Sequence, residues 1–128
     1  MPYSVVSNRK NTSVVLHFAS SNSTVLITGN TATSNIALPG ETITGAYITQ
    51  AVWGCDPNGY ITIKRGGQLV AAYDSTGQHE YAGAGMPINV GNTAANLQVD
   101  IMGSTNAFIL LELQKEGNLT ANSEYFQV

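Results

Sequence analysis

Three residues in the segment YDSTGQHEY carry groups that could take part in acid–base chemistry: Asp74, His79 and Glu80. General acid–base catalysis needs such groups together in one pocket. His79 and Glu80 are neighbours, so in an extended chain they point to opposite faces, which disfavours a shared metal ion. The Ser, Thr and Gly residues around them are typical of a loop between strands. We therefore expect a solvated loop with no catalytic residue and no metal site; a small hydrolase remains an alternative that would need a pocket joining these side chains.

Other signatures of catalysis or cofactor binding do not occur in the sequence. There is no G-x-S-x-G motif, and the glycines of GAGMP (83–87) are not followed by the lysine of a phosphate-binding loop. The one cysteine, Cys55, cannot form an internal disulfide, and we expect a thiol that is buried or lines a turn. The sequence thus predicts a protein that is not an enzyme and holds no cofactor.

Charge is scarce in this chain. Asp, Glu, Lys and Arg make up 10% of the 128 residues, and the net charge is −3, whereas about 25% is typical of soluble domains. Without a positive field to attract phosphates, we expect no nucleic-acid partner. A weakly charged surface is more easily desolvated, which favours contact with another protein. The pairs Arg9-Lys10 and Lys64-Arg65 are expected to be ordinary solvated charges.

The sequence gives no indication of a membrane partner. It has no apolar run of the length, about 18 residues, that a spanning helix needs. The start of the chain, MPYSVVSNRKN, lacks the basic and apolar regions of a signal peptide. We expect synthesis in a cytoplasm and no membrane association.

β-strands dominate the pattern of the chain. Runs rich in Val, Ile, Thr and Tyr recur between turn residues, and Leu97, Val99 and Ile101 alternate with polar residues at the period of a half-buried strand. The turn DPNG and the pair Gly66-Gly67 have the composition of tight turns. The predicted strands are 13–19, 24–29, 42–54, 59–66, 68–75, 79–83, 87–90, 96–102 and 107–115.

These elements predict an all-β fold, an antiparallel β-sandwich, with a jelly roll preferred to a closed barrel. We expect an N-terminal arm (1–11), a sandwich domain (12–117) and a C-terminal tail (118–128). Such ends either fold back on the edges of their own sheets or add a strand to a neighbouring chain. The candidate partner-binding residues lie in these ends: Tyr3, Val5, Arg9, Tyr125, Phe126 and Val128.

Aromatic residues offer an alternative function. Trp53, Tyr47, Tyr60, Tyr73 and Tyr81 could form a platform on which a sugar ring stacks, as in carbohydrate-binding sandwiches. Trp53 also ends a long alternating strand, which favours a packing role, and tyrosines on strands usually pack with the ring inward. Both interpretations stay open at this point.

Two long segments, AVWGCDPNGYITIKRGGQLVAAYDSTGQHEYAGAGMPINV and ANLQVDIMGSTNAFILLELQK, resemble small structural proteins of tailed bacteriophages. The resemblance implies a capsid decoration (cement) protein on the surface of the virion, or a tail-associated β-protein. It implies the major capsid protein and further copies of this chain, as a dimer or trimer, as partners. Such a protein binds between capsid subunits and stabilises the phage head; the alternative is a carbohydrate-binding or host-adhesion module.

Overall fold

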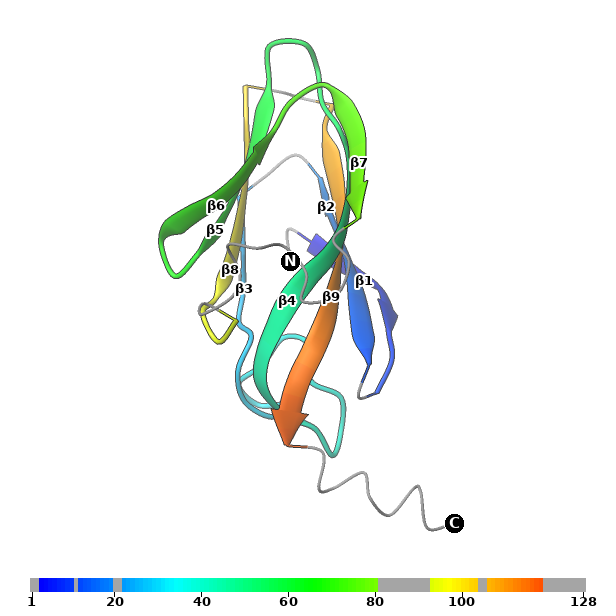
Figure 1. The fold of residues 1–128 in the computed structure, drawn as a ribbon, viewed down its shortest axis with the longest axis vertical. Coiled ribbons are helices and arrows are strands. Elements are labelled where there is room, and N and C mark those ends of the chain that lie inside the picture. Colours follow the sequence, from blue (N-terminus) through cyan, green and yellow to red (C-terminus); the bar gives the residue numbers. More distant parts are fainter. Residues whose placement is uncertain (1–2, 11, 20–21, 81–92, 104–105, 119–128) are drawn as a thin grey trace.

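Two antiparallel sheets pack face to face and enclose a single apolar core (Figure 1). The computed structural model describes residues 3–10, 12–19, 22–80, 93–103 and 106–118, and these residues form strands and turns without a helix. The predicted all-β antiparallel sandwich is therefore confirmed. Sheet A has the order β1 (Tyr3–Asn8), β2 (Ser13–Ala19), β9 (Phe108–Asn118), β4 (Thr42–Gly54) and β7 (Thr76–Glu80). Sheet B has the order β3 (Ser23–Val25), β8 (Leu97–Met102), β5 (Tyr60–Arg65) and β6 (Gln68–Tyr73).

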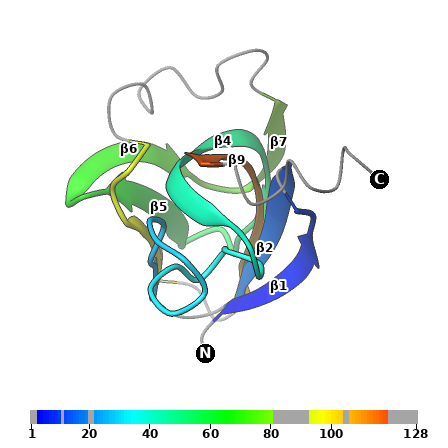
Figure 2. The same ribbon diagram turned by 90° about the horizontal axis from the view of Figure 1, so that it is seen from below.

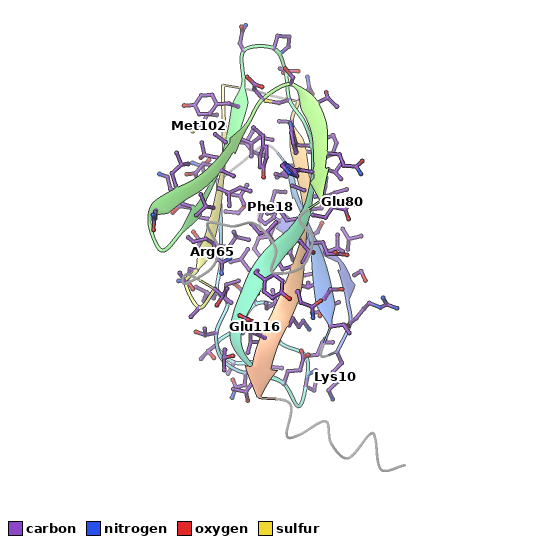
Figure 3. The ribbon with its side chains drawn as sticks, in the orientation of Figure 1. Lys10, Phe18, Arg65, Glu80, Met102 and Glu116 are labelled. Atoms are coloured by element: carbon purple, nitrogen blue, oxygen red, sulfur yellow. The ribbon has the colours of Figure 1, made fainter. Side chains whose placement is uncertain are left out.

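Alternating side chains explain why these segments form strands around one core. In β2, Val14, Leu16 and Phe18 are fully buried, while the residues between them are half-buried on the other face. Leu97, Val99 and Ile101 of β8 are buried in the core in the same way, as predicted, although Asp100 between them is buried as well. Figure 3 shows Phe18 between the two sheets. Because the side-chain period of a strand is two, each strand gives the core one apolar face.

The turn between β5 and β6 follows the prediction from the glycine pair. Gly66 and Gly67 have φ values of 59° and 86°, which residues with a Cβ rarely adopt. Two successive residues with positive φ make the hairpin turn whose twist matches the flanking strands. The turn therefore joins Arg65 directly to Gln68 across the hairpin.

The largest difference from the expected strands lies between β3 and β4. Strand 24–29 was predicted, but β3 ends at Val25 and a loop continues to Glu41. The side chain of Asn35 accepts a hydrogen bond from the backbone N–H of Leu26, at 2.8 Å, in place of a ladder partner. Seen from below, this loop covers the end of the core between the sheets (Figure 2).

Further boundaries differ from the prediction, and β9, expected to end at 115, continues to Asn118. Residues 3–8 of the expected arm form the strand β1, which was not among the predicted strands; it folds back and pairs with β2 of the same chain, the first of the two alternatives expected for the ends. The strand expected at 79–83 begins earlier, since β7 covers 76–80. The strand predicted at 87–90 lies outside the described residues.

Candidate functional site

The residues with possible acid–base chemistry are placed apart by the fold. Asp74 follows β6, and it lines a shallow depression together with Tyr60, Ala72 and Tyr73, not with His79 or Glu80. His79 and Glu80 are adjacent on β7, opposite Ala51 and Gln50 of β4. The side chains of Asp74, His79 and Glu80 are all exposed. The described part of the chain contains no group of three His, Cys, Asp or Glu side chains that could hold a metal ion.

Trp53 packs within the fold of its own chain. Its ring stacks on that of Tyr73 with centroids 4.0 Å apart, and its indole N–H donates to the carbonyl of Asp74 at 3.0 Å. Gly77 lies so close that an added Cβ would be 2.5 Å from the indole Cζ2. Tyr47 is half-buried, whereas Tyr60 is 45% exposed. Tyr81 lies outside the described residues.

The candidate partner-binding residues at the N-terminal end have different surroundings. Tyr3 is buried in the core of its own chain, with its ring 5.5 Å from that of Phe18, and burial raises the pKa of its phenol. Val5 is 45% exposed on the edge strand β1, and Arg9 is exposed in the turn that follows. The candidates at the other end, Tyr125, Phe126 and Val128, lie outside the described residues.

The surface that stands out is the face of sheet A that points away from sheet B, which we call the outer face. Val15 of β2, Leu110 of β9 and Val52 of β4 lie side by side on it, and with Gln50 and Glu112 they line a shallow depression of about 220 Å³. The strand register explains this grouping. Glu112 is opposite both Val15 and Gln50, and in the next row Leu110 is opposite both His17 and Val52.

A β-bulge in β4 places a hydrogen-bond donor beside the carboxylate of Glu112 in this depression. The register of β4 shifts between Ile48 and Gln50, so Thr49 is an extra residue opposite Glu112. Its hydroxyl donates to Oε1 of Glu112 at 2.7 Å. Among the described residues Oε2 of Glu112 makes no hydrogen bond, so it can accept one from a ligand.

The outer face carries acidic side chains and no Lys or Arg side chain. Glu80 of β7 stands opposite Gln50, in the same row as Glu112 (Figure 3 labels Glu80). The basic residues of the chain all lie elsewhere: Arg9 and Lys10 at the β1–β2 turn, Lys64 and Arg65 on β5, and Lys115 in the core. The depression is therefore apolar at its walls and negative at its rim.

The expectation of solvated charge is wrong for Arg65. The residue is fully buried, because it continues the inward-facing series of Ile61 and Ile63 along β5. Its Nη2 donates to the carbonyls of Ala46, at 2.9 Å, and Thr93, at 2.7 Å. Burial lowers its pKa to about 10, and the negative charge of Glu116 partly opposes this shift. Arg65 thus joins sheet B to the edge of β4.

That junction also explains a glycine in β4. β7 pairs with β4 only from Gln50 to Gly54. Beyond that pairing, the backbone N–H of Ala46 donates to the carbonyl of Thr93 at 2.9 Å. A Cβ added at Gly45 would lie 2.8 Å from the Thr93 hydroxyl and 2.8 Å from a carboxylate oxygen of Glu116. An alanine at this position would require the side chains of Thr93 and Glu116 to move.

A second buried cation closes the end of the core under the β3–β4 loop. Lys115 of β9 points inward, and its Nζ contacts Oε1 of Glu41 at 2.8 Å, with both side chains nearly inaccessible. The same oxygen accepts a hydrogen bond from the backbone N–H of Leu38 at 2.7 Å. The ion pair therefore ties the loop to β9.

No protein-family model matches this chain, and no curated protein matches it either. Nor do the described residues include a helix that is long and apolar enough to cross a membrane.

Proposed function

We propose that this protein is a non-enzymatic structural protein of a virion, a capsid decoration protein that binds between major capsid proteins through the outer face of sheet A. The observation that carries the proposal is the apolar depression of Val15, Val52 and Leu110, which spans three strands of a rigid sheet. Large contiguous apolar patches mark contact sites for other macromolecules, and in this proposal the three half-buried side chains form the centre of such a contact. The low charge of the chain and its resemblance to phage structural proteins support the same function.

Rigidity of the docking face fits a cementing role. β9 lies at the centre of sheet A and pairs along its length with β2 and β4, so the outer face is backed by a continuous ladder. A face that is already ordered loses little conformational entropy when it binds. Repetition over a shell would add avidity, because neighbouring contacts hold each copy at a high effective concentration.

We also infer that the sandwich has the jelly-roll topology. Leaving aside the added edge strand β1, the facing sheets have the orders β2-β9-β4-β7 and β3-β8-β5-β6. The chain crosses repeatedly between the sheets, as in a double Greek key of eight strands. This fold is common among viral capsid proteins, which agrees with the proposed role.

The proposal is tested by mixing the purified protein with undecorated phage heads, followed by sedimentation and heating. We expect the protein to sediment with the heads and to raise the temperature at which they open. Leu110→Glu should weaken co-sedimentation by about 100-fold, because it removes an apolar wall of the depression and places a carboxylate that must lose its water at the centre of the contact. The matched control is Leu69→Glu, since Leu69 is 53% exposed on β6 of the other sheet. The proposal would be refuted if the heads did not bind the wild-type protein, or if they bound the two variants equally well.

A carbohydrate-binding or host-adhesion function is the second candidate. It is favoured by the depression of about 240 Å³ that Tyr60, Ala72, Tyr73 and Asp74 line, where an exposed phenol ring stands beside a carboxylate. An aromatic face with a nearby polar group is suited to a sugar ring. In a glycan-binding screen, this candidate requires at least one binding glycan and a loss of about tenfold for Tyr60→Ala. Tyr47→Ala, on the other sheet, serves as the control, and a blank screen would eliminate this function.

A further inference from the structure

We propose that the outer-face depression is a binding site for one lysine side chain, presented by the surface on which the protein docks. The inference rests on the proposed function, because it names the chemical group that the partner inserts. It draws on the apolar walls of the depression, the oriented carboxylate of Glu112 and the absence of any Lys or Arg side chain from the outer face.

The walls suit the stem of a lysine. Val15, Val52 and Leu110 come from three adjacent strands, and all three side chains are half-buried, so the space between them is apolar and open on one side. The four methylene groups of lysine commonly lie along such surfaces while the ammonium group reaches a polar rim. A volume of about 220 Å³ accommodates a side chain of this size.

The rim suits an ammonium group better than a guanidinium group. Thr49 occupies one of the two acceptor positions of Oε1 of Glu112, whereas Oε2 has both of its positions open. Arginine binds a carboxylate best when its fork contacts both oxygens. An ammonium is a compact charge that needs one oxygen and has donors left for other acceptors, such as the Gln50 side-chain carbonyl.

The electrostatic surroundings favour a cation over other occupants. Glu112 and Glu80 lie in one row across the sheet with Gln50 between them, and no Lys or Arg side chain of the chain lies on this face. A second copy stacked on the outer face would bring two acidic rows together. A basic side chain from a different protein is the complementary partner.

The test uses the isolated full chain and needs no particle, so its failure is distinct from a failure of the capsid experiment. The probe is Nα-acetyl-lysine methylamide, and the comparison is the norleucine analogue, which has a similar aliphatic chain and no ammonium group. Methyl resonances of Val15, Val52 and Leu110 are followed by NMR. We expect the lysine probe to shift them with an affinity on the order of 10 mM, and the norleucine analogue to bind several-fold more weakly.

Two variants with the same change of charge locate the site. Glu112→Gln should weaken binding of the lysine probe by about tenfold, because the charge is lost while an oxygen remains that can accept from Thr49. Glu80→Gln lies in the same row but outside the depression, and should change the affinity by less than about twofold. The inference is overturned if the probe causes no shifts, if both variants bind equally, if norleucine binds as well as lysine, or if the protein self-associates through this face.

Discussion

Replacing Arg65 by alanine should lower the free energy of unfolding by about 4 kcal/mol. The guanidinium group donates to the carbonyls of Ala46, Thr93 and Ala95, at 2.9, 2.7 and 3.1 Å. Without it, these carbonyls lose a donor in a place that water does not reach freely, and the removed side chain leaves a cavity. Denaturant unfolding, followed by the fluorescence of the single tryptophan, measures the loss.

Lys64→Ala is the control for this prediction. Lys64 is the neighbouring basic residue on β5 but points to the other face, where it is half-buried. Its removal should change the free energy of unfolding by no more than about 0.5 kcal/mol. Arg65→Met, which keeps most of the stem, should still lose about 3 kcal/mol, because the hydrogen bonds are absent. A loss below about 1 kcal/mol for both Arg65 variants would contradict the role assigned to this side chain.

Separating the buried ion pair of Lys115 and Glu41 should have the next largest effect. Lys115→Met should cost about 3 kcal/mol, because it leaves the carboxylate of Glu41 buried without its cation. Glu41→Gln should cost about 2 kcal/mol, since the amide oxygen can still accept from the N–H of Leu38 but the charge of Lys115 is unpaired.

The double variant distinguishes an ion pair from two independent residues. With both charges removed, no unpaired charge stays buried, so Lys115→Met with Glu41→Gln should lose about 2 kcal/mol less than the sum of the single losses. Chemical unfolding of the four proteins gives this coupling energy directly. Strictly additive losses would show that the contact of 2.8 Å contributes no coupling.

The sequence predicts the strands of this protein better than it predicts the β3–β4 loop and the buried charges. The alternation of Leu97, Val99 and Ile101 and the glycine pair at 66–67 are local signals, and the structure follows both. The composition of TVLITG predicts a strand over 24–29, but the chain forms a loop after Val25, because Asn35 and Ser34 bind its backbone groups through side-chain hydrogen bonds. Those partners lie in the same loop, nine and seven residues away, but they carry no periodic signal.

The burial of Arg65 agrees with the alternation of β5 but not with the usual exposure of basic residues. The inward period of Ile61 and Ile63 continues to residue 65, but adjacent basic residues are usually solvated. The buried position depends on carbonyls from β4 and from residues 93–95, which only the fold brings together.

The outer-face depression could not be predicted because it is assembled across strands. Val15, Val52 and Leu110 are far apart in the chain, and their grouping depends on the register of β2, β9 and β4. The bulge at Thr49 also leaves no signal in the sequence, because one extra residue in a strand does not change the strand's amino-acid composition. Sequence patterns identify which face of each strand is buried, but not which exposed side chains become neighbours.

The sheet edges have a consequence for how the protein behaves when it is abundant. The described edge strands β1 and β6 each contain one residue outside the ladder, Val6 and Val70, at a β-bulge. The edge strand β3 has only three residues, and β7 ends in His79 and Glu80. Short, bulged or charged edges are poor templates for strand addition. A chain with so few charged residues would otherwise be more prone to fibrils and inclusion bodies, and edges of this kind disfavour that route of association.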